Sequence, residues 1–118
     1  MTHPVAYFEI TSADAAAAQK FYESLFDWKL AADPDMDGYA MVDTGAGDDA
    51  ISGGIGPAQG DEDAGIKIYV RVEDLDHHLS RAEELGGQRV LEPMELPGGY
   101  GSIAAFTDPD GNVVGLWA

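Results

Sequence analysis

Cysteine is absent from this chain of 118 residues, and only six lysines and arginines stand against 22 aspartates and glutamates. Without cysteine, disulfides, thiolate metal sites and cysteine nucleophiles are excluded, and the composition fits a reducing compartment. The formal net charge of −16 repels phosphate backbones and anionic lipid headgroups. We therefore expect neither nucleic acid nor a membrane as a partner. The acidity is interpreted as serving solubility or adaptation to a salty cytoplasm.

Long apolar runs are also missing, and no secretory leader is visible at the N-terminus. These absences predict a cytoplasmic protein. With 118 residues, the chain is long enough for one hydrophobic core but too short for two independent domains. Any internal duplication must therefore share a sheet or a core.

A strand followed by a helix organises the second half of the chain. Residues 67–72 alternate between polar and apolar types, and from Asp74 onward the apolar residues recur at helical spacing. Asp74 is a good helix N-cap, and Gly86-Gly87 predicts the end of the helix. The same unit recurs 60 residues earlier, where Asp14 corresponds to Asp74. A repeat near half the chain length suggests two similar modules.

Further strands follow each helix. The sequence predicts them at residues 28–32, 39–43, 50–56, 88–96, 100–107 and 112–117, separated by turns rich in glycine, proline and aspartate. Each half then has the order β-α-β-β-β. We expect one domain made of modules 1–56 and 66–118, joined by a polar linker at 57–65.

This pattern resembles the vicinal oxygen chelate superfamily, the group of glyoxalases, bleomycin-resistance proteins and extradiol dioxygenases. The matching motifs are Phe21-Tyr22, Leu25-Phe26-Asp27-Trp28, the helix end Glu83-Glu84-Leu85-Gly86-Gly87 and the closing Phe106-Thr107-Asp108-Pro109-Asp110-Gly111-Asn112. The resemblance implies an α+β fold in which the two modules form an incomplete, cup-shaped barrel. It also implies a small-molecule ligand on the concave face and a homodimer.

Enzymes of this family bind a divalent metal through His, Glu or Gln on the first and last strand of each module. The resemblance places these positions at Tyr7, Gly54, Lys67 and Gly115, and none of the four is a usual ligand. Glu9 is the one carboxylate on the same face of the first strand. We therefore predict no metal and no other cofactor, and metal-dependent glyoxalase or dioxygenase activity is disfavoured.

Strand alternation places Ile68 on the helix-packed core face and a mixture of aromatic and charged residues on the opposite face. On the first helix, Phe21 is expected to pack in the core. The candidate ligand-binding residues are Tyr7, Tyr39, Met41, Tyr69, Arg71, Met94, Tyr100 and Trp117. Glu9 and Lys67 are the candidate catalytic residues. Glu9 either forms a structural ion pair with Lys67 or Arg71, or acts as an acid-base or ligand-orienting carboxylate with Lys67 as its partner.

Three functions remain open on these residues. The first is metal-free binding of a small aromatic or amphipathic molecule, as in the drug-sequestering members of the family. The second is a metal-independent lyase or isomerase that uses Glu9 and Lys67. The third, a metal-dependent lyase or dioxygenase, has only the fold in its favour. His77 and His78 are interpreted as part of a solvated helix face. Gly53-Gly54-Ile55-Gly56 is not followed by a helix or a lysine, so it is not a nucleotide-binding loop.

Overall fold

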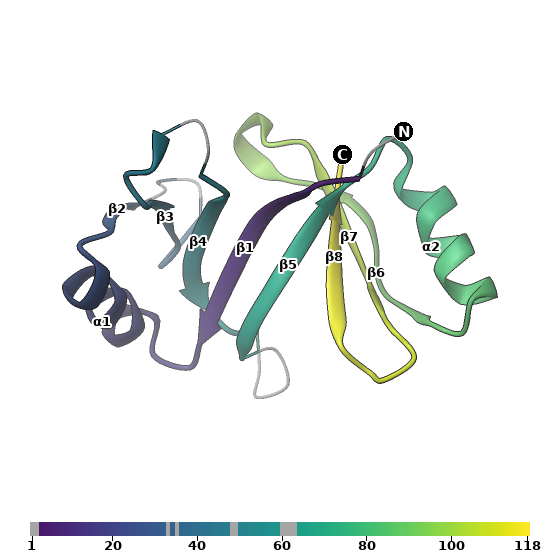
Figure 1. The fold of residues 1–118 in the computed structure, drawn as a ribbon, viewed down its shortest axis with the longest axis horizontal. Coiled ribbons are helices and arrows are strands. Elements are labelled where there is room, and N and C mark those ends of the chain that lie inside the picture. The colour runs from purple at the N-terminus through teal and green to yellow at the C-terminus, as the bar shows by residue number, and fades with distance from the viewer. Residues whose placement is uncertain (1–2, 33, 35, 48–49, 60–63) are drawn as a thin grey trace. The chain divides into compact units, whose positions relative to one another are not determined.

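The computed structural model describes residues 3–32, 34, 36–47, 50–59 and 64–118. The chain forms two compact units (Figure 1). The N-terminal unit is Tyr7–Ile66, and the C-terminal unit joins residues 3–6 to Lys67–Ala118. Part of the predicted linker, residues 60–63, lies outside the described residues, as do positions 33, 35, 48 and 49 of the predicted turns.

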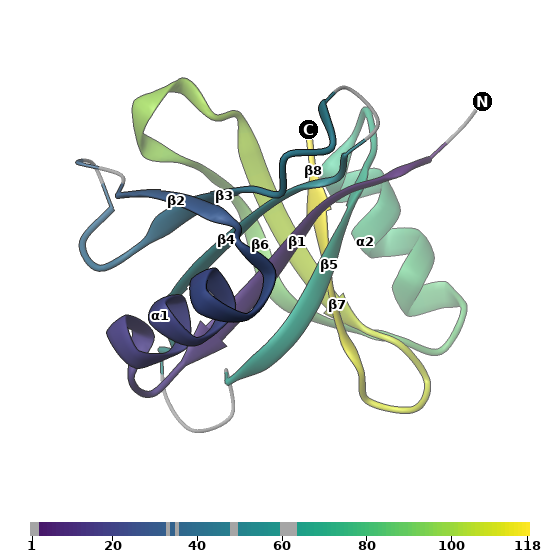
Figure 2. The same cartoon turned by 60° about the vertical axis from the view of Figure 1, so that its left-hand side comes forward.

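The N-terminal unit contains one helix and a mixed four-stranded sheet. Its elements are β1 (Val5–Ser12), α1 (Ala15–Phe26), β2 (Lys29–Ala32), β3 (Ala40–Asp43) and β4 (Ser52–Pro57). The strand order is β2-β3-β4-β1, with β1 parallel to β4 and the other neighbours antiparallel. Figure 2, in which this unit comes forward, shows α1 in front of strands of its own sheet.

The C-terminal unit repeats this plan. Its elements are β5 (Gly65–Arg71), α2 (Leu75–Glu84), β6 (Gln88–Glu95), β7 (Ser102–Thr107) and β8 (Val113–Trp117), with a 3-10 turn at Pro97–Gly99 between β6 and β7. The strand order is β5-β8-β7-β6, and β5 runs parallel to β8. The α+β class and the twofold β-α-β-β-β order are confirmed.

Both helices begin at the aspartates that the repeat identifies. The Asp14 carboxylate accepts a hydrogen bond from the Ala17 backbone N–H at 3.1 Å, and the Asp74 carboxylate accepts one from the His77 N–H at the same distance. Each bond satisfies a donor that the first helical turn leaves without a partner. After α2, the chain turns at Gly86 with a φ of 106°, a left-handed conformation that favours glycine.

Each unit has its own hydrophobic core between its helix and one face of its sheet. In the N-terminal unit, the core forms around Ile10, Val42 and Ile55, with Tyr22 and Trp28 packed against it. In the C-terminal unit, the buried residues are Val72, Leu75, Leu79, Ala104 and Leu116. Burial of these apolar side chains is the main favourable contribution to folding.

Two residues assigned to the core by sequence pattern are exposed instead. Phe21 keeps 58% of its surface exposed, because α1 turns it away from the sheet and no residue of this helix is fully buried. Ile68 keeps 41% exposed, because the buried leucines of α2 pack with Val72 near the end of β5 and leave the middle of the strand partly uncovered. The prediction that both contribute to the core is wrong.

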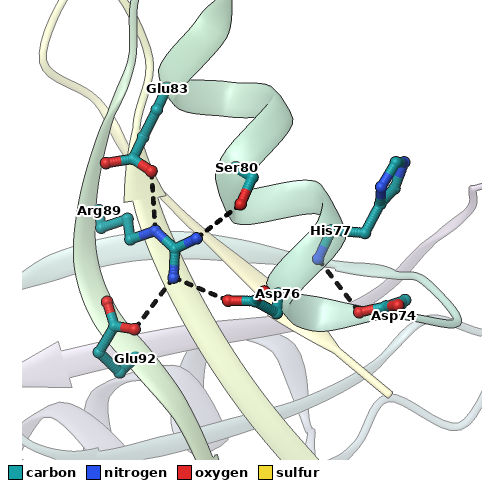
Figure 3. A network of polar contacts seen from close by, with 7 residues as sticks. All are labelled: Asp74, Asp76, His77, Ser80, Glu83, Arg89 and Glu92. Atoms are coloured by element: carbon teal, nitrogen blue, oxygen red, sulfur yellow. Dashed lines mark hydrogen bonds and ion pairs between the residues drawn. The ribbon is translucent and has the colours of Figure 1, made fainter.

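A charged network fastens α2 to β6 (Figure 3). Arg89 on β6 donates hydrogen bonds to Glu83 and Asp76 of α2 at 2.9 Å and to Ser80 at 2.8 Å. It also donates to Glu92 of its own strand at 3.0 Å. These hydrogen bonds, first to Glu83 and then to Asp76, raise the pKa of the Arg89 guanidinium. One cation thus holds three carboxylates together in a strongly acidic chain.

Arg89→Gln is expected to lower the thermal unfolding midpoint by several degrees at low ionic strength, because three neighbouring carboxylates lose their shared cation. Salt should shrink this difference, since it screens repulsion between exposed charges. Differential scanning calorimetry at low and at molar NaCl measures both effects. Arg81→Gln is the control, because its ion pair with Glu84 spans 3.7 Å between exposed side chains. Equal shifts for the two variants would contradict the prediction.

Candidate functional site

The open face of each unit is the sheet face opposite its own helix. In the N-terminal unit, four predicted site residues converge there. The hydroxyl of Tyr39 donates to Glu9 Oε2 at 3.0 Å and lies 2.6 Å from the hydroxyl of Tyr7. The Tyr7 hydroxyl also approaches Met41 Sδ at 3.7 Å. Tyr7 and Glu9 share this face of β1, as strand alternation predicts.

Proton counting fixes the direction of this chain of hydrogen bonds. A phenol carries one proton, and the proton of Tyr39 goes to the Glu9 carboxylate. Tyr7 must therefore donate to the Tyr39 oxygen in the short contact between them. Burial, reinforced by the charge of Glu9, raises the pKa of the Tyr39 phenol far above its usual range. Tyr39 consequently stays protonated and remains a donor to Glu9 throughout the physiological pH range.

The glycines of β4 make room for Tyr39. A Cβ added at Gly54 would lie 2.0 Å from the Tyr39 hydroxyl, and one at Gly56 would lie 2.3 Å from its ring. The ring therefore lies flat against the backbone of β4, where any larger residue would collide with it. On the opposite side of the same strand, a Cβ at Gly53 would collide with Phe8. Close packing of aromatic rings on the backbone explains the glycine-rich sequence of β4.

The open face of the C-terminal unit contains a second aromatic group. A Cβ at Gly115 would lie 2.2 Å from the Tyr69 ring, so Tyr69 covers β8 as Tyr39 covers β4. The Arg71 guanidinium lies 4.3 Å from the centre of the Trp117 ring, within cation–π distance. The Trp117 indole N–H donates to the Tyr100 carbonyl at 2.7 Å, which fixes the orientation of the indole.

The remaining predicted residues belong to this unit as well. Met94 on β6 and Tyr100 are 45% and 40% exposed, so both are accessible to a ligand. Lys67 is half-buried on β5. Glu9 and Lys67 belong to different units. Their pairing stays a prediction.

The residues at the family's metal positions do not fit a divalent ion. Gly54 and Gly115 offer no side chain, and a tyrosine ring fills the space above each of them. The Tyr7 hydroxyl is engaged with Tyr39, and the ammonium group of Lys67 repels a cation. Across the described residues, His, Cys, Asp and Glu form no cluster of three or more that could hold a metal.

Sequence reasoning missed the roles of the two covering rings. It identified glycine at both positions and tyrosine on both faces, but not that each ring lies on its glycine. For Tyr69, pairing of the two strands could have predicted the contact, because Tyr69 and Gly115 are direct partners in the parallel register of β5 and β8. Tyr39 precedes β3, and its position over β4 depends on the conformation of the loop before it.

Two β-α-β-β-β units, each with an aromatic open face, define a paired-module α+β fold. The chain belongs to the Glyoxalase/Bleomycin resistance protein/Dioxygenase superfamily, whose family model matches residues 4–116. No helix in the described part of the chain is long and apolar enough to cross a membrane.

Among curated proteins, the chain is similar to the anthracycline biosynthesis protein DnrV of Streptomyces peucetius. The alignment of the two sequences is 129 residues long and 29% identical, and it covers 95% of this chain and 46% of DnrV. The chain thus spans about half the length of the curated relatives it matches.

Solved structures show the same fold. Methylmalonyl-CoA epimerase from Mycobacterium tuberculosis has a TM-score of 0.66 at 20% identity, covering 94% of this chain and 84% of that one. A superfamily member from Vibrio splendidus 12B01 has a TM-score of 0.63 at 15% identity, covering 98% and 97%.

Proposed function

We propose that this protein binds a small aromatic or amphipathic molecule at the open face of the N-terminal unit without a metal ion. The observation that carries the proposal is the hydrogen-bond chain from Tyr7 through Tyr39 to Glu9, beside the thioether of Met41. It combines an oriented carboxylate with aromatic and polarizable surface, the mixture typical of a ligand site. A ligand hydroxyl or ammonium group would donate to Glu9.

The buried Tyr39 has a positioning role in this proposal. It is 8% exposed, and its hydroxyl holds one oxygen of the Glu9 carboxylate. A carboxylate has about four acceptor positions, and the bond from Tyr39 occupies one of them. Tyr7 and Met41 are half-exposed and would provide the direct apolar contact.

The similarity to DnrV supports an aromatic ligand. Anthracyclines are polycyclic aromatic molecules with several hydroxyl groups, and both properties suit a face made of tyrosines and a carboxylate. The open face of the C-terminal unit has its own stacking and cation–π surface at Tyr69, Arg71 and Trp117. We also expect a homodimer, which the exposed apolar side chains of Phe21, Leu25 and Phe26 on α1 support. The expected location is the cytoplasm.

The proposal predicts that Glu9→Gln and Tyr39→Phe each weaken ligand binding about tenfold, or about 1.4 kcal/mol. Each removes one member of a charge-assisted hydrogen bond and changes the shape of the face little. The measurement is isothermal titration with anthracyclines, quinones and aromatic acids selected by quenching of tryptophan fluorescence.

Tyr22→Phe is the matched control, because it makes the same change on the helix-packed face of the same unit. Hits that bind the wild type and both site variants with equal affinity would refute the role of Glu9 and Tyr39.

A second candidate, a metal-independent lyase or isomerase, is favoured by the same hydrogen-bond chain. A carboxylate held by a phenol that stays protonated is oriented to accept a proton from a bound substrate. The distinguishing measurement is exchange of a ligand C–H proton with D2O, followed by NMR. We expect exchange to be lost in Glu9→Gln and reduced in Lys67→Met if the protein is an enzyme, and to be undetectable in wild type if it only binds.

A further inference from the structure

The C-terminal unit has an apolar groove on the helix side of its sheet, opposite its open face. The cavity measures about 370 Å³. Val70, Phe106 and Leu116 of the sheet form its floor, and Ala82 of α2 and Leu85 just after the helix form one wall. Leu116 belongs to the hydrophobic core of this unit, and Val70 and Phe106 pack against it, so the floor of the groove is a partly uncovered extension of that core.

One end of the groove gathers most of the imidazole groups of the chain. His3 and His78 both line it, and their rings meet edge to face with centroids 5.0 Å apart. The ring of His77 lies 5.4 Å from that of His78. Arg81, one helical turn beyond His78, also lines the groove.

The tautomer of His78 follows from its hydrogen bond. Nδ1 lies 3.1 Å from the Asp74 carbonyl oxygen, which can only accept, so Nδ1 carries a proton. Protonation therefore adds a donor at Nε2 and a positive charge to the ring.

The opposite end of the groove is formed by the turn at Asp108-Pro109. The Asp108 carboxylate accepts from the backbone N–H groups of Asp110 and Asn112 and from the Asn112 side chain. These bonds, led by the Asn112 side chain, hold the pKa of the Asp108 carboxyl below its usual range. One end of the groove is thus anionic and the other is cationic when the histidines are protonated.

The charge distribution makes the histidine end unusual for this protein. The chain has only six lysines and arginines and three histidines, and its net charge is −16. All three histidines and Arg81 are nevertheless grouped around one end of an apolar cavity. Asp74, which caps α2, and Glu84, which lies 3.7 Å from Arg81, are carboxylates next to these groups. An anionic headgroup would find complementary charge there when the histidines are protonated.

We propose that this groove binds a monocarboxylate with an unbranched acyl chain, with its carboxylate at His3, His78 and Arg81. The wall from His78 to Leu85 extends over eight residues, or roughly 10 Å at the rise of a helix, which suits an acyl chain of medium length. The apolar floor would cover the chain, and the histidine end would offset the charge of the headgroup. This site is separate from the open face, where Glu9 presents negative charge.

The test is titration of decanoate into the full chain by calorimetry. The double variant His78→Gln/Arg81→Gln should bind at least about tenfold more weakly, because it removes two headgroup partners. Ala82→Phe should abolish binding by filling the groove. Lys20→Gln on α1 is the control for loss of a positive charge, and Glu9→Gln is the control for the open face; neither should change the affinity.

Two further comparisons separate the headgroup from the tail. Decanoate should bind more tightly when the pH is lowered from about 8 to about 5.5, the range in which imidazoles gain a proton. Decanol, which has the same tail but no charge, should show no such dependence. Thermal unfolding and circular dichroism check that Ala82→Phe remains folded. If Ala82→Phe does not fold, the affinity of His78→Gln/Arg81→Gln for decanoate still tests the proposal.

Four outcomes would overturn the proposal. Three come from the binding measurements: no measurable decanoate binding to the wild type, equal affinity of the wild type and His78→Gln/Arg81→Gln, or an affinity that does not change with pH. Sedimentation provides the remaining one. If Ala82→Phe converts a dimer into a monomer, a second copy of the chain covers the groove and the proposal is wrong. An unchanged oligomeric state together with lost decanoate binding supports it.

Discussion

Gly54→Ala is expected to lower the free energy of unfolding by about 2–3 kcal/mol, a large effect for the addition of one methyl group. The added Cβ would lie 2.0 Å from the Tyr39 hydroxyl, a distance that two non-bonded atoms cannot keep. The ring must therefore leave the backbone of β4. Because Tyr39 then loses its hydrogen bond to Glu9, ligand affinity at the open face should fall together with stability.

A double-mutant cycle distinguishes this collision from a general effect of alanine in a strand. In a Tyr39→Ala background, the space above Gly54 is vacant, and Gly54→Ala should cost at least about 1 kcal/mol less than in the wild type. Urea unfolding of the four proteins measures the coupling. Gly115→Ala with Tyr69→Ala is the parallel cycle in the C-terminal unit. An identical cost in both backgrounds would show that the ring is not the cause.

Leu79→Ala should destabilise the protein by about 3 kcal/mol, within the range measured for large-to-small core substitutions. Leu79 is fully buried at 0% exposure, and it packs from α2 against Val72, Ala104 and Leu116. Removing its isobutyl group loses the transfer free energy of the buried atoms and leaves a cavity, because the strands beneath cannot collapse into the space.

Leu85→Ala is the matched control for this core substitution. It deletes the same atoms just after the same helix, at a position that is 63% exposed, and should change stability by about 0.5 kcal/mol or less. Chemical denaturation monitored by far-UV circular dichroism measures both variants. If Leu79→Ala proved as mild as Leu85→Ala, the assigned core of the C-terminal unit would be wrong.

Local sequence signals determined the secondary structure and the order of elements. Asp14 and Asp74 are N-caps because a short carboxylate can reach the free N–H groups of the first turn, a property that needs no tertiary contact. The change from a period of two to a period near 3.6 located each strand-to-helix junction. Strand alternation also placed Tyr7 and Glu9 on one face of β1, because parity along a strand is a purely local property.

Tertiary structure alone decided which residues meet across strands and helices. The Tyr39 ring lies on Gly54, and Arg89 joins three carboxylates, because strand register and the docking of α2 bring distant positions together. Exposure also depends on packing: Phe21 and Tyr22 are adjacent aromatics on one helix, yet Phe21 is exposed while Tyr22 packs against the core. The groove beside α2 exists because the helix covers only part of its sheet, and an amphipathic pattern does not specify how much of a face its partner covers.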